Sequence, residues 1–179
     1  LNGEGLQHED GHSHILAGTI PNCISYDPTF AHEVGVILHH GLKRMVEKQD
    51  NVFYYLTLLN ENYAMPGLTP GTEEQIIKGM YLCKAGGKNK TRVQLMGSGT
   101  ILRESLAAQE LLAKDWGIAA DVWSCPSFNE LTRDGQDAER FNMLHPLETP
   151  RVPFVAQQLA KHDGPVIAST DYMKNYAEQ

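Results

Sequence analysis

The sequence predicts an α/β fold in which the strands are mainly parallel. Short, continuous apolar runs rich in β-branched and aromatic residues recur between segments whose apolar residues have helical spacing; the clearest runs are 23–27, 51–59 and 165–170. Runs of this length without alternation are typical of strands covered on both faces of a parallel sheet. The alternation of strand and helix predicts βαβ units stacked into α/β domains.

The chain begins with a segment that predicts a loop and then a strand followed by a helix. Residues 1–20 are rich in glycine and histidine, and they show no apolar stripe. The strand 23–27 ends at Asp27, which we expect to be the N-cap of a helix over 29–48. Pro28 suits the first helical position, because proline lacks the N–H that would remain unpaired there.

The strand predicted over 51–59 completes a strand–helix–strand unit, and a long polar connection follows it. Residues 60–71 contain two prolines and two glycines, which favour turns over regular structure. Thr72 with Gln75 has the form of a capping box, so we expect a short helix from there to about Cys83.

The second half predicts another α/β pattern, with Gly117 as the C-cap of its longest helix. The expected order is a loop (85–90), a strand (92–99), a helix (101–117), a strand (120–125), a segment that begins helical and becomes irregular (127–146), a helix (152–162), a buried strand (165–170) and a helix that starts at Asp171. A tight Gly-Ser-Gly turn at 97–99 lacks the third glycine of a dinucleotide fingerprint, which favours plain turn chemistry. The helix start beside it could still hold an anion.

Composition limits the classes of protein and partner. The chain has 179 residues and a net charge of −7, and its densest basic stretch is only KNKTR, so we expect no nucleic-acid partner. No apolar run approaches the ~18 residues of a membrane span, and no signal peptide is evident. Cys23, Cys83 and Cys125 lack metal-ligand spacing, which indicates reduced thiols in a cytoplasmic protein.

The stretch LQHEDGHSH, residues 6–14, concentrates titratable groups that could carry chemistry. His8 to His12 fits H-E-x-x-H, but a zinc site of that type needs both histidines on one face of a helix. Neighbouring glycines and the turn-forming Asp10 and Ser13 disfavour that helix. The open alternatives are a polar surface loop and an active-site loop in which imidazoles and carboxylates set each other's protonation.

The longer motifs resemble a known enzyme family over essentially all 179 residues. LNGEGLQHEDGHSH, TIPNCISYDP, LNENY, LMGSGTILRE and ELTRDGQDAERFNMLHPLETPRVPF are similar to the homodimeric pyruvate dehydrogenase first component, a thiamine diphosphate-dependent relative of transketolase. The resemblance implies that residues 1–68 are the end of the middle, pyrimidine-binding domain. Residues 69–179 would be most of a transketolase C-terminal-like α/β domain. The start at Leu1 and the helical end also lead us to expect a piece of a longer protein.

The resemblance transfers only a few site residues to this chain. His8 matches the family's active-site histidine in GEGLQHEDGHSH, and Glu4 matches the glutamate of the same stretch, so both are candidate catalytic residues. The wider superfamily pattern E-D-G-x-[ST]-H lines a substrate channel, and Asp10 and His14 are its matching candidates here. The family's diphosphate motif and its cofactor-activating glutamate are not found in these residues.

The function implied by the resemblance is decarboxylation of pyruvate followed by reductive acetylation of a lipoyl group. The expected cofactors are thiamine diphosphate and Mg²⁺, with their main ligands outside this chain. The expected partners are pyruvate, the lipoyl domain of the dihydrolipoyl acetyltransferase component and a second copy in a homodimer. The 179 residues alone should be inactive. Two other classes remain open, a zinc hydrolase and a non-catalytic α/β module for assembly or dimerisation.

Overall fold

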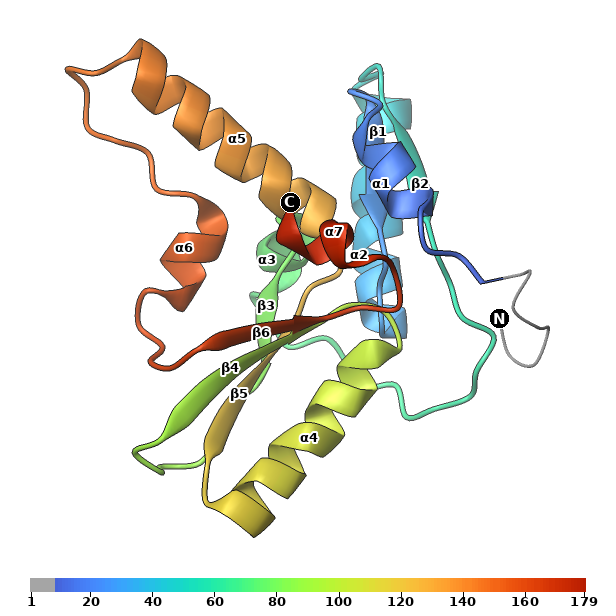
Figure 1. Ribbon diagram of the computed structural model, residues 1–179. Helices are drawn as coiled ribbons and strands as arrows, with labels where there is room; N and C mark the ends of the chain where they lie inside the picture. The colour runs from blue at the N-terminus through green and yellow to red at the C-terminus, as the bar shows by residue number, and fades with distance from the viewer. Residues whose placement is uncertain (1–8) are drawn as a thin grey trace.

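The computed structural model describes residues 9–179, which form two sheets surrounded by helices (Figure 1). The elements are, in order, α1 (Ser13–Gly18), β1 (Cys23–Tyr26), α2 (Ala31–Leu42), the π-helix η2 (Lys43–Glu47), β2 (Phe53–Leu56), α3 (Glu73–Ile77), β3 (Tyr81–Lys84), β4 (Arg92–Gly97), α4 (Ile101–Trp116), β5 (Ala119–Ser124), α5 (Phe128–Leu144), α6 (Phe154–Leu159), β6 (Val166–Ser169) and α7 (Lys174–Glu178). The predicted α/β fold with a mainly parallel sheet is confirmed.

The smaller sheet is the predicted strand–helix–strand unit. β1 and β2 pair in parallel, with Cys23 opposite Phe53, and α2 with η2 connects them. The helix begins at Ala31, so the predicted N-cap role of Asp27 is wrong. The carboxylate of Glu33 instead accepts hydrogen bonds from the backbone N–H groups of Thr29 (2.6 Å) and Phe30 (3.0 Å). This substitute cap releases the Asp27 side chain for another role.

The larger sheet has the strand order β3-β5-β4-β6, and only β3 is antiparallel to its neighbour. α4 lies on one face of this sheet, and α5, α6 and α7 lie on the other (Figure 1). Two apolar clusters fill the spaces: Leu95, Leu102, Ala120 and Val122 under α4, and Met96, Trp123, Phe128, Phe154 and Tyr176 on the opposite side. α4 ends as predicted, at Gly117 with the left-handed φ of 64°.

The helix predicted from Thr72 to about Cys83 is wrong in its second half. α3 ends at Ile77, and the residues up to Cys83 enter β3 instead. Gly79, at φ 102°, turns the chain in a conformation that side chains with a Cβ rarely adopt, and this turn ends the helix. The Thr72 hydroxyl donates to a carbonyl before the helix rather than capping it.

A segment expected to be a loop is helical, and a segment expected to begin helical and become irregular stays helical to Leu144. Residues 13–18 form α1, and the whole of 128–144 forms α5. In α5, Leu131 and Ala138 are buried seven residues apart, so a single face packs on the body of the protein although the segment is polar. The hydroxyl of Ser127 accepts from the Glu130 N–H and caps this helix.

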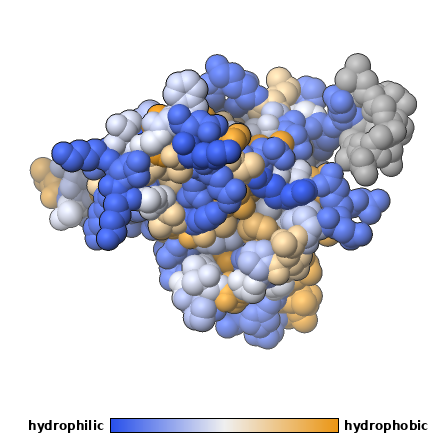
Figure 2. Space-filling view, turned by 90° about the horizontal axis from the view of Figure 1, so that it is seen from below, coloured by the Kyte–Doolittle hydropathy of each residue, from blue (hydrophilic) through white to orange (hydrophobic). Residues whose placement is uncertain are grey.

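The strands predicted to be buried at 51–59 and 165–170 are in fact half-exposed. β2 and β6 each have one neighbouring strand among residues 9–179, and Phe53 and Ile167 are 45% and 50% exposed. Figure 2 shows hydrophobic residues reaching the surface among hydrophilic ones on the face viewed from below. None of the helices in the described part of the chain is long and apolar enough to span a membrane.

Candidate active site

The carboxyl ends of four parallel strands, two from each sheet, converge on one cluster of buried and half-buried residues. Asp27 follows β1, Thr57 follows β2, Ser98 follows β4 and Thr170 follows β6, and His14 on α1 joins them. We call these five residues the carboxyl-end cluster. In α/β proteins this edge of a parallel sheet is where ligands bind, which makes the cluster the natural centre of a candidate active site.

Asp27 lies at the centre of the carboxyl-end cluster and is 4% exposed. Its carboxylate accepts hydrogen bonds from the hydroxyls of Thr57 (2.7 Å) and Ser98 (2.9 Å). Its backbone accepts from the Gly99 N–H (2.9 Å) and donates to the Pro126 carbonyl (2.7 Å). Burial raises the pKa of Asp27 to about 6, although the two hydroxyl bonds oppose the rise. Asp27 therefore ties together segments from both sheets.

The Gly-Ser-Gly turn before α4 packs directly against the Asp27 carboxylate. A Cβ on Gly99 would lie 2.6 Å from Asp27 Oδ2, and the φ of Gly99 is 53°. Glycine is needed there because the backbone must both adopt this angle and approach the carboxylate closely. A dissolved anion at this helix start would therefore meet the negative charge of Asp27.

His14 is completely buried among three tyrosine rings that come from distant parts of the chain. Its ring stacks on Tyr176 of α7 at 4.9 Å between centroids, and Tyr172 and Tyr55 meet it edge-on at 4.7 and 5.5 Å. This burial lowers the pKa of His14 to about 4, with the charge of Asp10 opposing the shift. The imidazole is therefore neutral at physiological pH.

The hydrogen bonds of the carboxyl-end cluster fix which nitrogen of His14 carries the proton. His14 Nε2 lies 2.8 Å from the hydroxyl oxygen of Thr57. Thr57 has one proton and gives it to the Asp27 carboxylate, which can only accept. His14 must then donate from Nε2, and its Nδ1 is a bare acceptor without a partner in the described part of the chain.

Asp10, the other substrate-channel candidate, lies at the exposed start of α1. Its Oδ1 accepts the backbone N–H groups of His12 (3.1 Å) and Ser13 (3.0 Å), and the Ser13 hydroxyl donates to Oδ2. Partial burial would raise the pKa of Asp10, but these hydrogen bonds outweigh it and lower the pKa. Asp10 can meet a ligand in this conformation, whereas His14 is enclosed.

The two catalytic candidates, Glu4 and His8, lie outside the described residues. The segment that follows them, 9–12, is not helical, and α1 begins only at Ser13. A zinc site of the H-E-x-x-H type needs a helix through this stretch, so the backbone contradicts that alternative. Within residues 9–179, no three histidine, cysteine or acidic side chains converge as a metal site would require.

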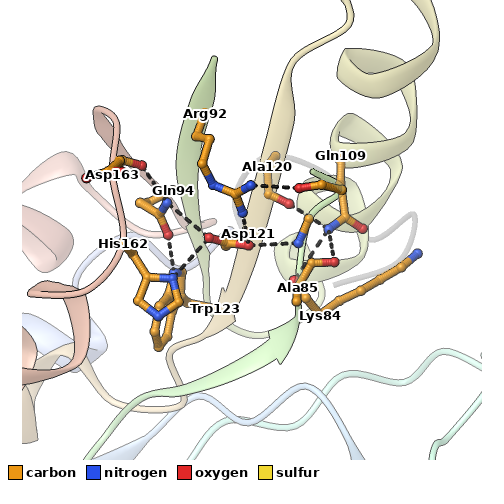
Figure 3. A network of polar contacts seen from close by, with 12 residues as sticks. Lys84, Ala85, Arg92, Gln94, Gln109, Ala120, Asp121, Trp123, His162 and Asp163 are labelled. Carbon is orange, nitrogen blue, oxygen red and sulfur yellow. Dashed lines mark hydrogen bonds and ion pairs between the residues drawn. The ribbon is translucent and has the colours of Figure 1, made fainter. Parts of the chain in front are cut away.

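A second polar cluster surrounds Asp121 in the larger sheet (Figure 3). Its carboxylate accepts from the Gly86 N–H (2.7 Å), Arg92 (2.8 Å), Gln94 (3.2 Å) and His162 (3.0 Å). Burial alone would raise the pKa of Asp121, but these four donors hold it well below its ordinary value. Because every side of the carboxylate is engaged, the cluster joins β4, β5 and the approach to β6 rather than offering a reactive group.

Sequence analysis missed Asp27, Thr57 and the tyrosines around His14. A signal for Asp27 was present, because it is a polar residue at the end of an apolar strand of a parallel sheet, where functional side chains gather. Thr57 lay inside the strand predicted over 51–59, and only the end of β2 at Leu56 places it after the strand. The tyrosines carry no such signal, since Tyr172 and Tyr176 meet His14 only through the tertiary fold.

Comparison with known families assigns both parts of the chain. Residues 79–179 match the family described as "Transketolase-like TK C-terminal domain". The chain belongs to this transketolase-like family. Residues 1–66 match "Pyruvate dehydrogenase E1 component middle domain". The division at residues 68 and 69 stays a prediction.

Relatives within this transketolase-like family are close in sequence. Proteins named "Pyruvate dehydrogenase E1 component" from Escherichia coli K12, Pseudomonas aeruginosa and Cupriavidus necator are 63%, 60% and 59% identical over all of this chain. The predicted resemblance to the pyruvate dehydrogenase first component is therefore confirmed. The chain spans about a fifth (20%) of the length of these relatives.

Among solved structures, a transketolase from Pichia stipitis is similar in fold. It aligns with 86% of this chain and 21% of its own length, at a TM-score of 0.50 and 19% identity. At that identity the likeness concerns the fold alone.

Proposed function

We propose that this chain is part of a pyruvate dehydrogenase component that decarboxylates pyruvate and reductively acetylates a lipoyl group. The lipoyl group belongs to the dihydrolipoyl acetyltransferase component. The observation that carries the proposal is the identity of 53–63% over the whole chain to proteins named pyruvate dehydrogenase E1 component. Because the chain spans a fifth of those proteins, the activity is assigned to a longer protein that contains it.

The described residues do not fit as ligands for the proposed cofactors, thiamine diphosphate and Mg²⁺. The start of α4, which follows the Gly-Ser-Gly turn, lies against the Asp27 carboxylate, which would repel phosphate oxygens. No cluster within residues 9–179 could hold the metal. Both sets of ligands would therefore lie outside this chain.

The contribution of this chain would come from the segment before α1. His8, as an imidazolium, would neutralise the carboxylate of pyruvate or a developing alkoxide, and it would donate a proton during acetyl transfer. Glu4 would hold His8 in position, as a neighbouring carboxylate does for other histidines. Asp10, which is exposed at the start of α1, would line the substrate channel. His14, which is buried in α1, would support the wall of that channel from behind.

The proposal extends to the assembly and location of the longer protein. It would act as a homodimer in the cytoplasm and dock the lipoyl domain. The isolated 179 residues would be inert toward pyruvate, because the diphosphate and metal ligands are not among them.

The test compares His8→Ala with His12→Ala in the full-length protein. His12 is exposed on the same segment, so it controls for the loss of an imidazole from this stretch. We expect His8→Ala to lower the turnover number for pyruvate roughly 10²–10⁴-fold without changing the unfolding midpoint. His12→Ala should stay near the wild-type rate. Equal rates for wild type and His8→Ala would remove His8 from the mechanism.

A further inference from the structure

We propose that Asp27 and Thr57 are positioning residues that hold His14 in its Nε2–H tautomer and so fix α1 beside the candidate catalytic segment. This inference deepens the proposed function and rests on it for its kinetic test. It assigns no contact with substrate to either residue. Their effect would reach the reaction through His14 and the backbone that it anchors.

The polarity of the carboxyl-end cluster is the main support. Above about pH 6 the Asp27 carboxylate is ionised and can only accept, so both hydroxyls that touch it, from Thr57 and Ser98, must donate to it. With its proton spent on Asp27, Ser98 accepts from the Thr170 hydroxyl (3.0 Å), as Thr57 accepts from His14 (2.8 Å). The Asp27 carboxylate thereby sets the direction of each hydrogen bond in the series that links His14, Thr57, Asp27, Ser98 and Thr170.

The orphaned nitrogen of His14 makes the choice of tautomer matter. Within residues 9–179, no group reaches the buried Nδ1, and a buried polar atom without a partner is costly. If Thr57 no longer accepted from Nε2, His14 would lose its only side-chain hydrogen bond in the described part of the chain. Only packing against the tyrosines that enclose the ring would then orient it.

The C-terminal part of the chain closes over the same histidine. Tyr176 stacks on His14, Tyr172 meets its edge, and the Met173 N–H donates to the Gly11 carbonyl at 3.1 Å. Gly11 lies three residues after His8 in the sequence. Residues from both family-matched parts of the chain therefore hold the start of α1. Asp27 acts on this contact through its hydrogen bond with Thr57, which in turn bonds to His14.

Within residues 9–179, the charges that act most strongly on Asp27 are both negative. Glu33 on α2 and Asp171 after β6 both raise the pKa of Asp27 through their charge. Tyr172 and Tyr176 face it from the C-terminal side, and burial raises the pKa of each phenol, so both stay neutral. With no ion pair to Asp27 in the described part of the chain, the carboxylate depends on its two hydroxyl donors, which is why we expect kcat to be sensitive to the loss of the Thr57 hydroxyl.

The test uses Thr57→Val and Thr57→Ser in the full-length protein with thiamine diphosphate and Mg²⁺. Valine keeps the shape of threonine and removes the hydroxyl, whereas serine keeps the hydroxyl. We expect Thr57→Val to lower kcat about 10- to 100-fold with KM little changed, because displacement of a supporting group by ~1 Å can cost as much as ~10²-fold. Thr57→Ser should restore kcat close to the wild-type value. Thr132→Val removes a similar half-buried hydroxyl from α5 and should leave kcat unchanged.

A second measurement reports the tautomer of His14 and does not depend on enzyme activity. With ¹⁵N-labelled histidine, NMR distinguishes protonation at Nε2 from protonation at Nδ1, and the His14 signal is assigned by its loss in His14→Gln. We expect Nε2–H alone in wild type and Thr57→Ser, and a mixed or Nδ1–H signal in Thr57→Val. Should Thr57→Val fail to fold, Asp27→Asn decides by the same two readings.

The outcomes separate this inference from the proposed function. Unchanged kcat and an unchanged His14 signal in Thr57→Val would overturn it, and so would an equal loss in the valine and serine variants. A full-length wild type that does not turn over pyruvate would overturn the proposed function instead. The NMR reading would then still decide whether Asp27 and Thr57 set the tautomer.

Discussion

The pH dependence of stability should change in opposite directions when Asp27 and His14 are replaced. The pKa of His14 falls from 6.5 to about 4 on folding, and the pKa of Asp27 rises from 3.8 to about 6. At about 1.4 kcal/mol per pKa unit, each group contributes a pH-dependent stability of about 3 kcal/mol.

The signs of the two contributions oppose each other. Between about pH 4 and 6.5, the unfolded chain protonates His14 while the folded chain does not, so this contribution to stability is lost as the pH falls. Over nearly the same range the folded chain keeps the proton on Asp27 longer than the unfolded chain does. That contribution is present at low pH and is lost as the pH rises through about 6. In the wild-type protein the two largely cancel.

The assay is urea unfolding of wild type, Asp27→Asn and His14→Gln at pH 4.5, 5.5 and 6.5, pH values within the range set by the two pKa shifts. Relative to wild type, Asp27→Asn should gain about 2 kcal/mol between the lowest and highest pH, whereas His14→Gln should lose a similar amount, because only part of each full contribution changes between pH 4.5 and 6.5. Glutamine can still donate to Thr57, so it removes the titration with little loss of the hydrogen bond. Parallel pH curves for all three proteins would refute the assignment of these two groups as buried and oppositely shifted.

Two further predictions concern residues away from this cluster. Asp121→Asn should destabilise the chain by about 3 kcal/mol, because Arg92 and His162 lose the carboxylate charge that they share. Its control, Asp115→Asn at an exposed position, should change stability by no more than about 0.5 kcal/mol. Urea unfolding of both variants checks this prediction, and equal losses of stability would contradict it. Gly164→Ala should cost about 1–3 kcal/mol, because φ is 101° and a Cβ would lie 2.0 Å from the Arg92 carbonyl oxygen. Its control, Gly135→Ala in the middle of α5, should be stabilising by about 0.5–1 kcal/mol, and thermal unfolding that ranks the two glycines in reverse would refute the steric argument.

The sequence predicted the elements whose local signals agree with their tertiary surroundings. The strand at 23–26 and the helix at 101–116 have strong patterns and clear ends, and Gly117 closes α4 as expected. The predictions failed where tertiary contacts decide the outcome. The residues of β3 become a strand because they pair with β5, and α5 continues through its polar half because one narrow face packs on the body.

The candidate site divides in the same way. The concentration of histidines and carboxylates at 6–14 pointed to Asp10 and His14 from the sequence, and the family resemblance gave their proposed roles. The partners of His14 could not be found that way, because Thr57 lies 43 residues away along the chain and donates in turn to Asp27. Hydrogen bonds between residues so far apart follow from the packing of the two sheets rather than from any local pattern.

The most direct test of the central claim is acetyl transfer from pyruvate to an isolated lipoylated domain by the full-length protein, followed by mass spectrometry. We predict an acetylated lipoyl group that forms only when pyruvate, thiamine diphosphate and Mg²⁺ are all present. An unmodified lipoyl domain, from a folded protein with both cofactors bound, would contradict the proposed function.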